Sequence, residues 1–143
     1  ERVVEEVRRA LAPQAAQKRI SIVSEGALTL WAVEKDLWEI LHNLMGNAIR
    51  YGRRGGHVKI LLRQRCIIVE DDGIGIEKKH LPYLFEQFYR VDQSRDPEVR
   101  GTGLGLSIVR TLAERNGATV GVESCPGRGS RFMVCFEQKQ DGD

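Results

Sequence analysis

Residues 35–51 read KDLWEILHNLMGNAIRY and carry the strongest helical pattern in the chain. Apolar side chains recur there at intervals of three and four residues, which is the period of one face of an α-helix. Gly52 follows the pattern and is typical of a helix end. The sequence therefore predicts a helix with one buried face, formed by Leu37, Ile40, Leu41, Leu44, Met45 and Ala48.

Polar side chains occupy the opposite face of this helix: Asp36, Glu39, Asn43 and Asn47. Each step of four residues turns only about 40° further around the axis, so these side chains form one row. A row of carboxyl and amide oxygens suits Mg²⁺, although a solvated helix face gives the same pattern. Two asparagines in mid-helix lower helix propensity, and this favours a binding site.

Further elements are expected on both sides of this helix. Residues 1–17 show a helical stripe of Val4, Val7 and Leu11, with no capping residue before it, so we expect a longer protein in which another segment precedes this helix. Residues 20–22 and 28–30 alternate around a turn at 24–26 and predict two short strands.

The second half of the chain predicts strands, a short helix, a long loop and another helix. Strands are expected at residues 57–62 and 66–70, paired through a link without Gly or Asn, and as a hairpin of residues 120–122 and 132–136. A short helix is expected near 77–84, a helix from 101–105 to Asn116-Gly117, and a frayed tail at 138–143. Residues 71–100 are mostly irregular, which is typical of a lid or binding loop. Because helices and strands mix without a regular βαβ order, we predict one α+β domain, a two-layer sandwich with a mostly antiparallel sheet against helices.

Composition excludes several classes of protein. The chain has 143 residues, 41% of them hydrophobic, and 22 Lys+Arg against 20 Asp+Glu give a net charge of +2. These values are ordinary for a soluble globular domain and exclude a disordered chain, a coiled coil and a uniformly basic nucleic-acid binder. A local basic group of Arg53, Arg54, Lys59, Arg63 and Arg65 lacks an aromatic stacking platform, so we expect no nucleic-acid partner.

The three cysteines are Cys66, Cys125 and Cys135. Their number is odd and no C-x-x-C spacing occurs, which argues against a zinc site and against paired disulfides. We expect reduced, buried thiols.

Residues 71–75 read DDGIG and follow the apolar run 67–69, so a predicted strand delivers a carboxylate at its end. Gly73 and Gly75 allow close approach of a flat ring, and the Asp71 carboxylate can accept a hydrogen bond from an exocyclic amine such as that of adenine. The alternative is a plain turn, because Asp-Gly pairs are common in turns.

Residues 101–106 read GTGLGL and stand directly before a predicted helix. Unpaired backbone N–H groups and the positive end of the helix dipole favour a phosphate there. No Lys-Ser/Thr follows, as a Walker loop requires, and no strand precedes, as a dinucleotide fingerprint requires. A glycine hinge without ligand is the alternative.

Taken together, these motifs resemble the ATP-binding domain of sensor histidine kinases, within the GHKL superfamily of gyrase-type, heat-shock chaperone and mismatch-repair ATPases. Residues 43–48 (NLMGNA) resemble its N box, 71–75 its first glycine box, 85–90 (FEQFYR) its F box and 101–106 its second glycine box. Residues 127–132 resemble its closing hairpin. The resemblance implies a sandwich of the Bergerat type with an ATP lid, and ATP and Mg²⁺ as ligands.

The resemblance also implies roles for single residues. Asp71 would bind the adenine amine, Asn47 would hold Mg²⁺ with Asn43 beside it, and Arg50 would approach the phosphates. Arg90 would pair with phosphate oxygens or anchor the lid to Asp92 or Glu98, and Phe85 and Phe88 would latch the base of the lid or pack in the core. Asn43 and Arg90 are the expected catalytic positions. The expected nucleotide-binding positions are Asn43, Asn47, Arg50, Tyr51, Asp71, Gly73, Gly75, Ile76, Tyr89, Arg90, Gly101, Thr102, Gly103, Leu104, Gly105, Leu106 and Ser130.

Two departures from the family pattern limit the expected activity. Hydrolytic members carry a Glu general base where this sequence has Asn43, and an amide takes no proton from water, so we expect slow ATP hydrolysis. None of His42, His57 and His80 is followed by an acidic residue, as the family's phosphoacceptor histidine is. We therefore expect the phosphate to pass to a histidine on a separate dimerisation domain and later to a response regulator.

Alternative functions are a serine kinase of the anti-sigma-factor type and a catalytically silent module gated by nucleotide. We expect this domain to be cytoplasmic and monomeric, within a parent protein that is membrane-anchored or cytosolic. No apolar run reaches the roughly 18 residues of a membrane span, and the sequence opens with the charged residues Glu1 and Arg2, so we expect no signal peptide at this point.

Overall fold

A single five-stranded sheet forms one layer of the protein. The computed structural model describes residues 2–28, 30, 32–87 and 105–137. The strands are β1 (Ser21–Gly26), β2 (His57–Arg63), β3 (Cys66–Asp71), β4 (Ala118–Cys125) and β5 (Gly129–Phe136). Their order in the sheet is β1-β2-β3-β5-β4, with β1 parallel to β2 and every other pair antiparallel.

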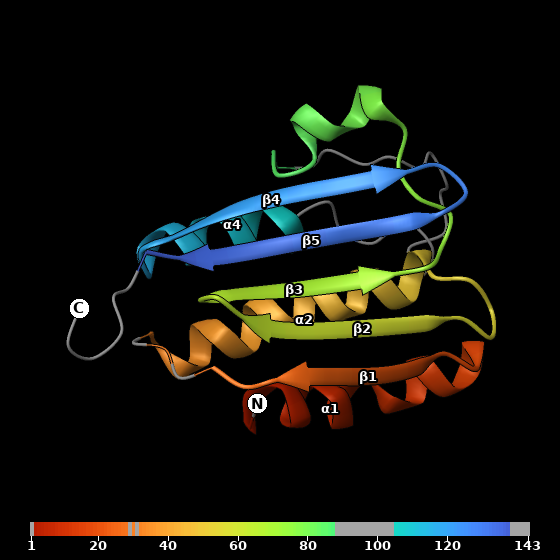
Figure 1. The fold of residues 1–143 in the computed structure, drawn as a ribbon, viewed down its shortest axis with the longest axis horizontal. Coiled ribbons are helices and arrows are strands. Elements are labelled where there is room, and N and C mark those ends of the chain that lie inside the picture. Colours follow the sequence, from red (N-terminus) through yellow and green to blue (C-terminus); the bar gives the residue numbers. More distant parts are fainter. Residues whose placement is uncertain (1, 29, 31, 88–104, 138–143) are drawn as a thin grey trace.

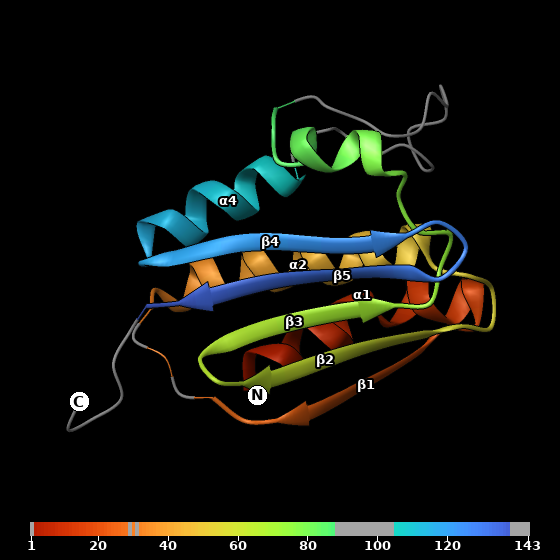
Figure 2. The ribbon, with the colours of Figure 1, turned by 45° about the horizontal axis from the view of Figure 1, so that its top comes forward.

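Helices cover one face of this sheet and leave the other face open (Figures 1 and 2). They are α1 (Arg2–Lys18), α2 (Glu34–Tyr51) and α4 (Gly105–Arg115), and a short 3-10 helix, η1 (Lys78–Tyr83), contacts β4. The predicted α+β sandwich with a mixed, mostly antiparallel sheet is therefore confirmed. The predicted helix near 77–84 is present as 3-10 rather than α, and Pro82 inside it has no N–H to donate to the α-helical ladder.

The core lies between the sheet and the three α-helices. Alternate residues of each strand point into it, as the period of two requires. Side chains with less than 2% of their surface exposed fill its centre: Val7, Ile40, Leu44, Met45, Val58, Ile60, Val69, Val109 and Val134.

The prediction of a second short strand at residues 28–30 was wrong. Leu28 and Leu30 lie in irregular chain and are half-buried against the core. Residues 24–26, expected as a turn, instead continue β1 in register with β2 up to the pair Gly26 and Leu62. The alternating apolar residues Leu28 and Leu30 therefore reflect packing against the core and not a strand.

The link between β2 and β3 is a two-residue turn, and the predicted pairing of these strands is confirmed. Arg63 pairs with Cys66, which fixes the register that the sequence left open. Gln64 and Arg65 have φ of 53° and 64°, so two residues other than glycine adopt the left-handed conformation. The backbone N–H of Phe136 donates to Arg65 O at 2.9 Å and fixes this turn against β5.

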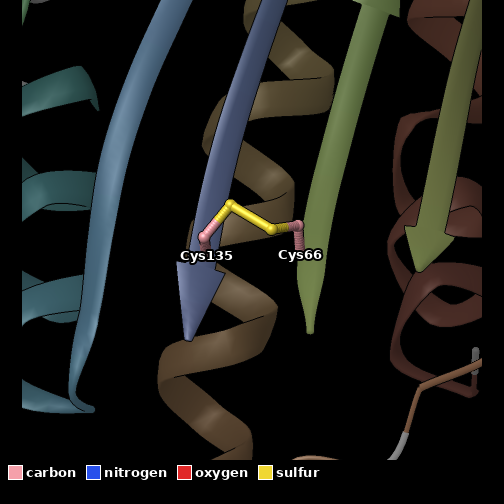
Figure 3. The surroundings of a disulfide bond; sticks show 2 residues. All are labelled: Cys66 and Cys135. Carbon is pink, nitrogen blue, oxygen red and sulfur yellow. A yellow bond between two sulfur atoms is a disulfide. The ribbon is translucent and has the colours of Figure 1, made fainter. Parts of the chain in front are cut away.

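The prediction of three reduced, buried thiols was also wrong. Cys66 on β3 pairs directly with Cys135 on β5, their Cα atoms lie 4.1 Å apart, and a disulfide joins them (Figure 3). Both alternate with core residues, so the bridge lies on the face of the sheet away from the helices. Cys125 is free but exposed. Cysteine number and local spacing could not reveal a pairing that depends on sheet register.

Within the described ranges, no helix is long and apolar enough to cross a membrane.

Candidate nucleotide site

One face of α2 connects the separate motifs of the candidate site. Asn43, Asn47 and Tyr51 are spaced four residues apart, so they share this face over about 12 Å of helix. All three are half-buried. The row begins beside the start of α4 and ends beside the loop that follows β3.

Asn43 lies against the first residue of α4. A Cβ built on Gly105 would stand only 3.0 Å from Asn43 Oδ1. The Asn43 Nδ2 group donates to Glu39 O at 2.8 Å, which orients the amide with its oxygen toward α4. Glycine at position 105 thus allows the amino-terminal turn of α4 to approach the amide of Asn43 closely.

Asp36 does not face the candidate site, although the sequence placed it in one polar row with Asn43 and Asn47. It is 3% exposed and bonds to Arg115 and Asn116 at the far end of α4. The hydrogen bonds and charge of Arg115, with the amide of Asn116, lower the pKa of Asp36 below its usual value. Asp36 is therefore not available as an ion ligand beside Asn43 and Asn47.

Asp71 is the last residue of β3 and alternates with Val69, so its side chain lies on the helix-covered face. Its Oδ1 accepts from the backbone N–H of Gly73 at 2.9 Å. Burial raises the pKa of Asp71 above its usual value, while the amides of Gly73 and Ser130 oppose the rise. The result is a half-buried carboxylate at the end of a rigid strand.

Ser130 lies directly opposite Asp71 on β5 and is 9% exposed. Its hydroxyl is 2.8 Å from Ser124 Oγ, which also accepts from the backbone N–H of Ile76 at 2.7 Å. Ser130 and Ile76 are thus joined by Ser124, a residue that the sequence did not indicate. A serine in a strand gives no signal of this kind until the register of β4 with β5 is known.

The glycines of the DDGIG loop have backbone neighbours. A Cβ on Gly73 would lie 2.1 Å from Tyr51 O, and one on Gly75, where φ is +74°, would lie 2.2 Å from Cys125 O. Ile74 N also donates to Tyr51 O at 3.2 Å. The absence of a Cβ at Gly73 and Gly75 therefore allows the loop to pack closely against the end of α2 and the β4–β5 turn.

Asp72 holds the loop in place, unlike its neighbour Asp71. Its carboxylate accepts from the backbone N–H of His57 at 2.9 Å and contacts the His57 ring at 3.1 Å, while Arg53 donates to Asp72 O at 3.0 Å and also to Gly127 O. Burial raises the pKa of Asp72, but the His57 bonds outweigh it and the pKa is lowered. The two adjacent acids thus have opposite shifts.

Lys18 is a further residue near this site that the sequence did not single out. From the end of α1 its Nζ donates to Ile49 O at 2.9 Å and to Arg50 O at 2.8 Å, so it binds the carbonyls of the last turn of α2. Burial and the charge of Arg54 lower the pKa of Lys18, and the charge of Asp71 opposes them. The Arg50 side chain itself is exposed.

Some of the remaining predicted positions lie within the described ranges, and others lie outside them. Gly105 and the half-buried Leu106 begin α4. Phe85 packs edge-on against Phe132, with ring centroids 6.2 Å apart, as a core contact. Predicted positions that lie outside the described residues are Phe88, Tyr89, Arg90, Gly101, Thr102, Gly103 and Leu104, with the tail at 138–143.

Among the described residues no cluster of three or more His, Cys, Asp or Glu side chains could hold a metal ion. The amide oxygens of Asn43 and Asn47 remain available at this site as ligands for a cation, together with the oxygens of a bound ligand.

Residues 32–140 match the model of the family described as histidine kinase-, DNA gyrase B-, and HSP90-like ATPases. The chain belongs to this family. The predicted family is thus confirmed, and the relatives of this chain include proteins named as sensor proteins and sensor histidine kinases. The phosphate regulon sensor protein PhoR of Pseudomonas aeruginosa is 40% identical over 126 residues, covering 85% of this chain and 28% of that protein. Sensor histidine kinase RppB of Synechocystis is 38% identical over 118 residues, covering 80% and 26%.

Solved structures share the fold of this chain. The mycobacterial sensor histidine kinase MprB aligns with a TM-score of 0.76 at 23% identity, covering 91% of both chains. The full-length ShkA structure in complex with AMPPNP aligns with a TM-score of 0.76 at 29% identity, covering 92% of this chain and 28% of that one. The chain spans about a quarter of the length of the curated relatives named above.

Proposed function

We propose that this chain is the catalytic domain of a two-component sensor kinase, which binds Mg-ATP and donates its γ-phosphate to a histidine on a separate dimerisation domain. The observation that carries this proposal is the continuous row from the start of α4, through Asn43 and Asn47, to Tyr51 and the Asp71 loop. Family membership and the sensor histidine kinase relatives support it.

Asp71 would bind the base. Its half-buried carboxylate accepts from the exocyclic amine of adenine, while a guanine presents a carbonyl oxygen at the same place and is disfavoured. Ser130 and Ile76 flank Asp71 through Ser124, and Tyr51 lies at the end of the α2 row. Gly73 and Gly75 would contribute by setting the position of the loop.

The start of α4 would receive the phosphates. Unpaired backbone N–H groups and the dipole of α4 favour anions at that end. Gly101, Thr102, Gly103 and Leu104 precede it in sequence and would extend the group of amide donors. Arg50 and Arg90 would supply positive charge to the phosphates, Arg90 also at the transferred group.

Asn47, with Asn43 beside it, fits a magnesium ion bound mainly through phosphate oxygens and water. Mg²⁺ prefers oxygen ligands and keeps several waters, so one amide oxygen and the phosphates are sufficient. When bound, the ion neutralises charge on the β- and γ-phosphates. The residues of this chain then align the γ-phosphate for attack by an imidazole nitrogen; the new N–P bond replaces the bond to the β-phosphate oxygen, and ADP leaves.

The decisive experiment mixes the domain with the histidine hairpin of its parent kinase and ATP labelled in the γ position. We expect label on the hairpin that is lost in acid, because phosphohistidine is acid-labile, and that depends on Asp71 and Asn47. Acid-stable label would instead indicate a serine kinase, and binding of ATP without transfer would indicate a silent module. The labelled hairpin should then pass phosphate to its response regulator.

Binding alone is tested by calorimetry with a non-hydrolysable ATP analogue and Mg²⁺. Asp71→Asn should weaken binding by about 1–3 kcal/mol, the usual cost of an unsatisfied polar partner. A GTP analogue should bind less tightly than the ATP analogue, and sedimentation of the isolated domain should show a monomer. Equal affinity of Asp71→Asn and the unchanged chain would contradict the assignment of Asp71.

A further inference from the structure

The buried carboxylate of Asp36 joins the start of α2 to the end of α4. Arg115, the last residue of α4, donates from Nε to Asp36 Oδ2 at 3.0 Å and from a second guanidinium nitrogen to Oδ1. Asn116 Nδ2 also donates to Oδ2, at 2.8 Å. A two-nitrogen fork on a carboxylate fixes direction as well as distance, so this contact resists both sliding and rotation of α4.

Asn116 extends the contact to the backbone of both helices. Its Nδ2 donates to Leu112 O at 2.8 Å, within the last turn of α4. Its Oδ1 accepts from the backbone N–H of Val33 at 2.9 Å, the residue that precedes α2 and whose own side chain makes no cap. Asp36, Arg115 and Asn116 together form what we call the α2–α4 clamp.

The other end of α4 contacts the same helix. Gly105 lies against Asn43, seven residues after Asp36 on α2. α4 spans 11 residues, about 16 Å, and lies on the helix-covered side of the sheet, behind β4 and β5 in Figure 1, between these two contacts. A shift of α4 along its axis would change the position of its first turn relative to Asn43 and Asn47. The clamp opposes such a shift.

We propose that Asp36 is a positioning residue for phosphate binding: through Arg115 and Asn116 it sets where the amino-terminal turn of α4 stands beside Asn43 and Asn47. The inference rests on the proposed function, in which that turn meets the phosphates of ATP. Asp36 itself touches no ligand. Its effect is therefore confined to the phosphate-bearing part of the nucleotide.

The test compares two ligands on folded protein. Asp36→Asn keeps the size of the side chain but removes the charge that Arg115 binds. We expect its affinity for a non-hydrolysable ATP analogue with Mg²⁺ to fall about tenfold, because a small misplacement of binding groups is costly. Its affinity for adenosine, followed by NMR titration, should change less than about twofold, since the contacts that hold the Asp71 loop are with the end of α2, the start of β2 and the β4–β5 turn.

Glu70→Gln is the matched control. Glu70 accepts from Arg131 Nε at 2.7 Å across β3 and β5, on the face of the sheet away from the helices. This variant also loses one acid of an ion pair but leaves the clamp intact, and it should bind both ligands as the unchanged chain does. Arg115→Lys, which keeps the charge but loses the fork, carries the test if Asp36→Asn does not fold.

The outcomes separate the two claims. If the unchanged chain binds the analogue and Asp36→Asn binds it equally well, or loses adenosine affinity to the same degree, the positioning role is wrong and the proposed function stands. If the unchanged chain binds no nucleotide at all, the proposed function fails and the positioning role fails with it.

Discussion

Asp71 and Asp72 are adjacent in the chain, yet their environments separate their roles. Asp72 has a lowered pKa because His57 binds it, and it holds the loop to β2. Asp71 has a raised pKa because it is buried on the side of the helices. A charged group kept partly out of water without a strong cationic partner is more typical of a binding residue than of a structural one.

The raised pKa of Asp71 predicts that adenosine binding weakens in mild acid. The carboxylate takes up a proton as the pH falls through its raised pKa, and the protonated form is a poorer acceptor for the amine. We expect adenosine affinity to fall as the pH drops through this raised pKa, by up to about tenfold per pH unit below it, and to begin falling at a higher pH than an ordinary aspartate would cause. Adenosine has no phosphates, so their titration does not interfere with this measurement.

Asp71→Asn is the control for this effect. It should bind adenosine weakly and show no such fall with pH. Because the pKa of Asp71 is raised on folding, the stability associated with its neutral form is lost as the pH rises through that pKa. Asp71→Asn should therefore need more denaturant to unfold at neutral pH than the unchanged chain, the opposite of its effect on binding.

Glycine substitutions in the Asp71 loop and in α2 are expected to have opposite effects on stability. Gly73→Ala would place a Cβ 2.1 Å from Tyr51 O, so the Asp71 loop must move away from α2. We expect a loss of about 2–4 kcal/mol in the free energy of unfolding. Gly46→Ala lies within α2 with its nearest neighbour 3.9 Å away and should add about 0.5–1 kcal/mol through helix propensity. Urea unfolding of both variants checks this, and equal losses would contradict it.

Because a disulfide joins β3 and β5, we expect the protein to be less stable under reducing conditions. Cys66 and Cys135 are 69 residues apart, so the bridge restricts a long loop in the unfolded chain. Reduction should lower the free energy of unfolding by about 2–4 kcal/mol. Guanidinium unfolding with and without dithiothreitol measures this. Cys66→Ser should abolish the difference and Cys125→Ser, at the exposed free thiol, should preserve it.

The whole domain is predicted to hydrolyse ATP slowly by itself. By the resemblance, Asn43 stands where hydrolytic members of the family carry a Glu general base, and an amide takes no proton from water; its Nδ2 donates to Glu39 O. We expect turnover well below about one per second, under the rates typical of enzymes. Release of phosphate from labelled ATP measures it, and a rate of several per second would show that another group acts as the base.

Most of the fold could be predicted from the sequence, because long elements with one buried face carry a clear period. The helix of residues 34–51 and the hairpin of β4 and β5 are of this kind. The disulfide, the Ser124–Ser130 contact and the α2–α4 clamp could not be predicted, since each joins residues whose proximity depends on sheet register or on how two helices dock. The same holds for the different environments of Asp71 and Asp72, which have identical side chains and neighbouring positions.

The sheet order places β5, the last of the described strands, between β3 and β4 rather than at an edge. During synthesis, a nascent chain that has emerged only as far as β4 has no partner for the inner edge of β3, and Asp71 has no Ser130 opposite it. The central pairing of the sheet and the base-binding end of the site therefore form together, only after β5 has been synthesised and after the helices that cover them have been made. An incomplete chain on the ribosome would thus carry the helix with both asparagines but could not yet select adenine.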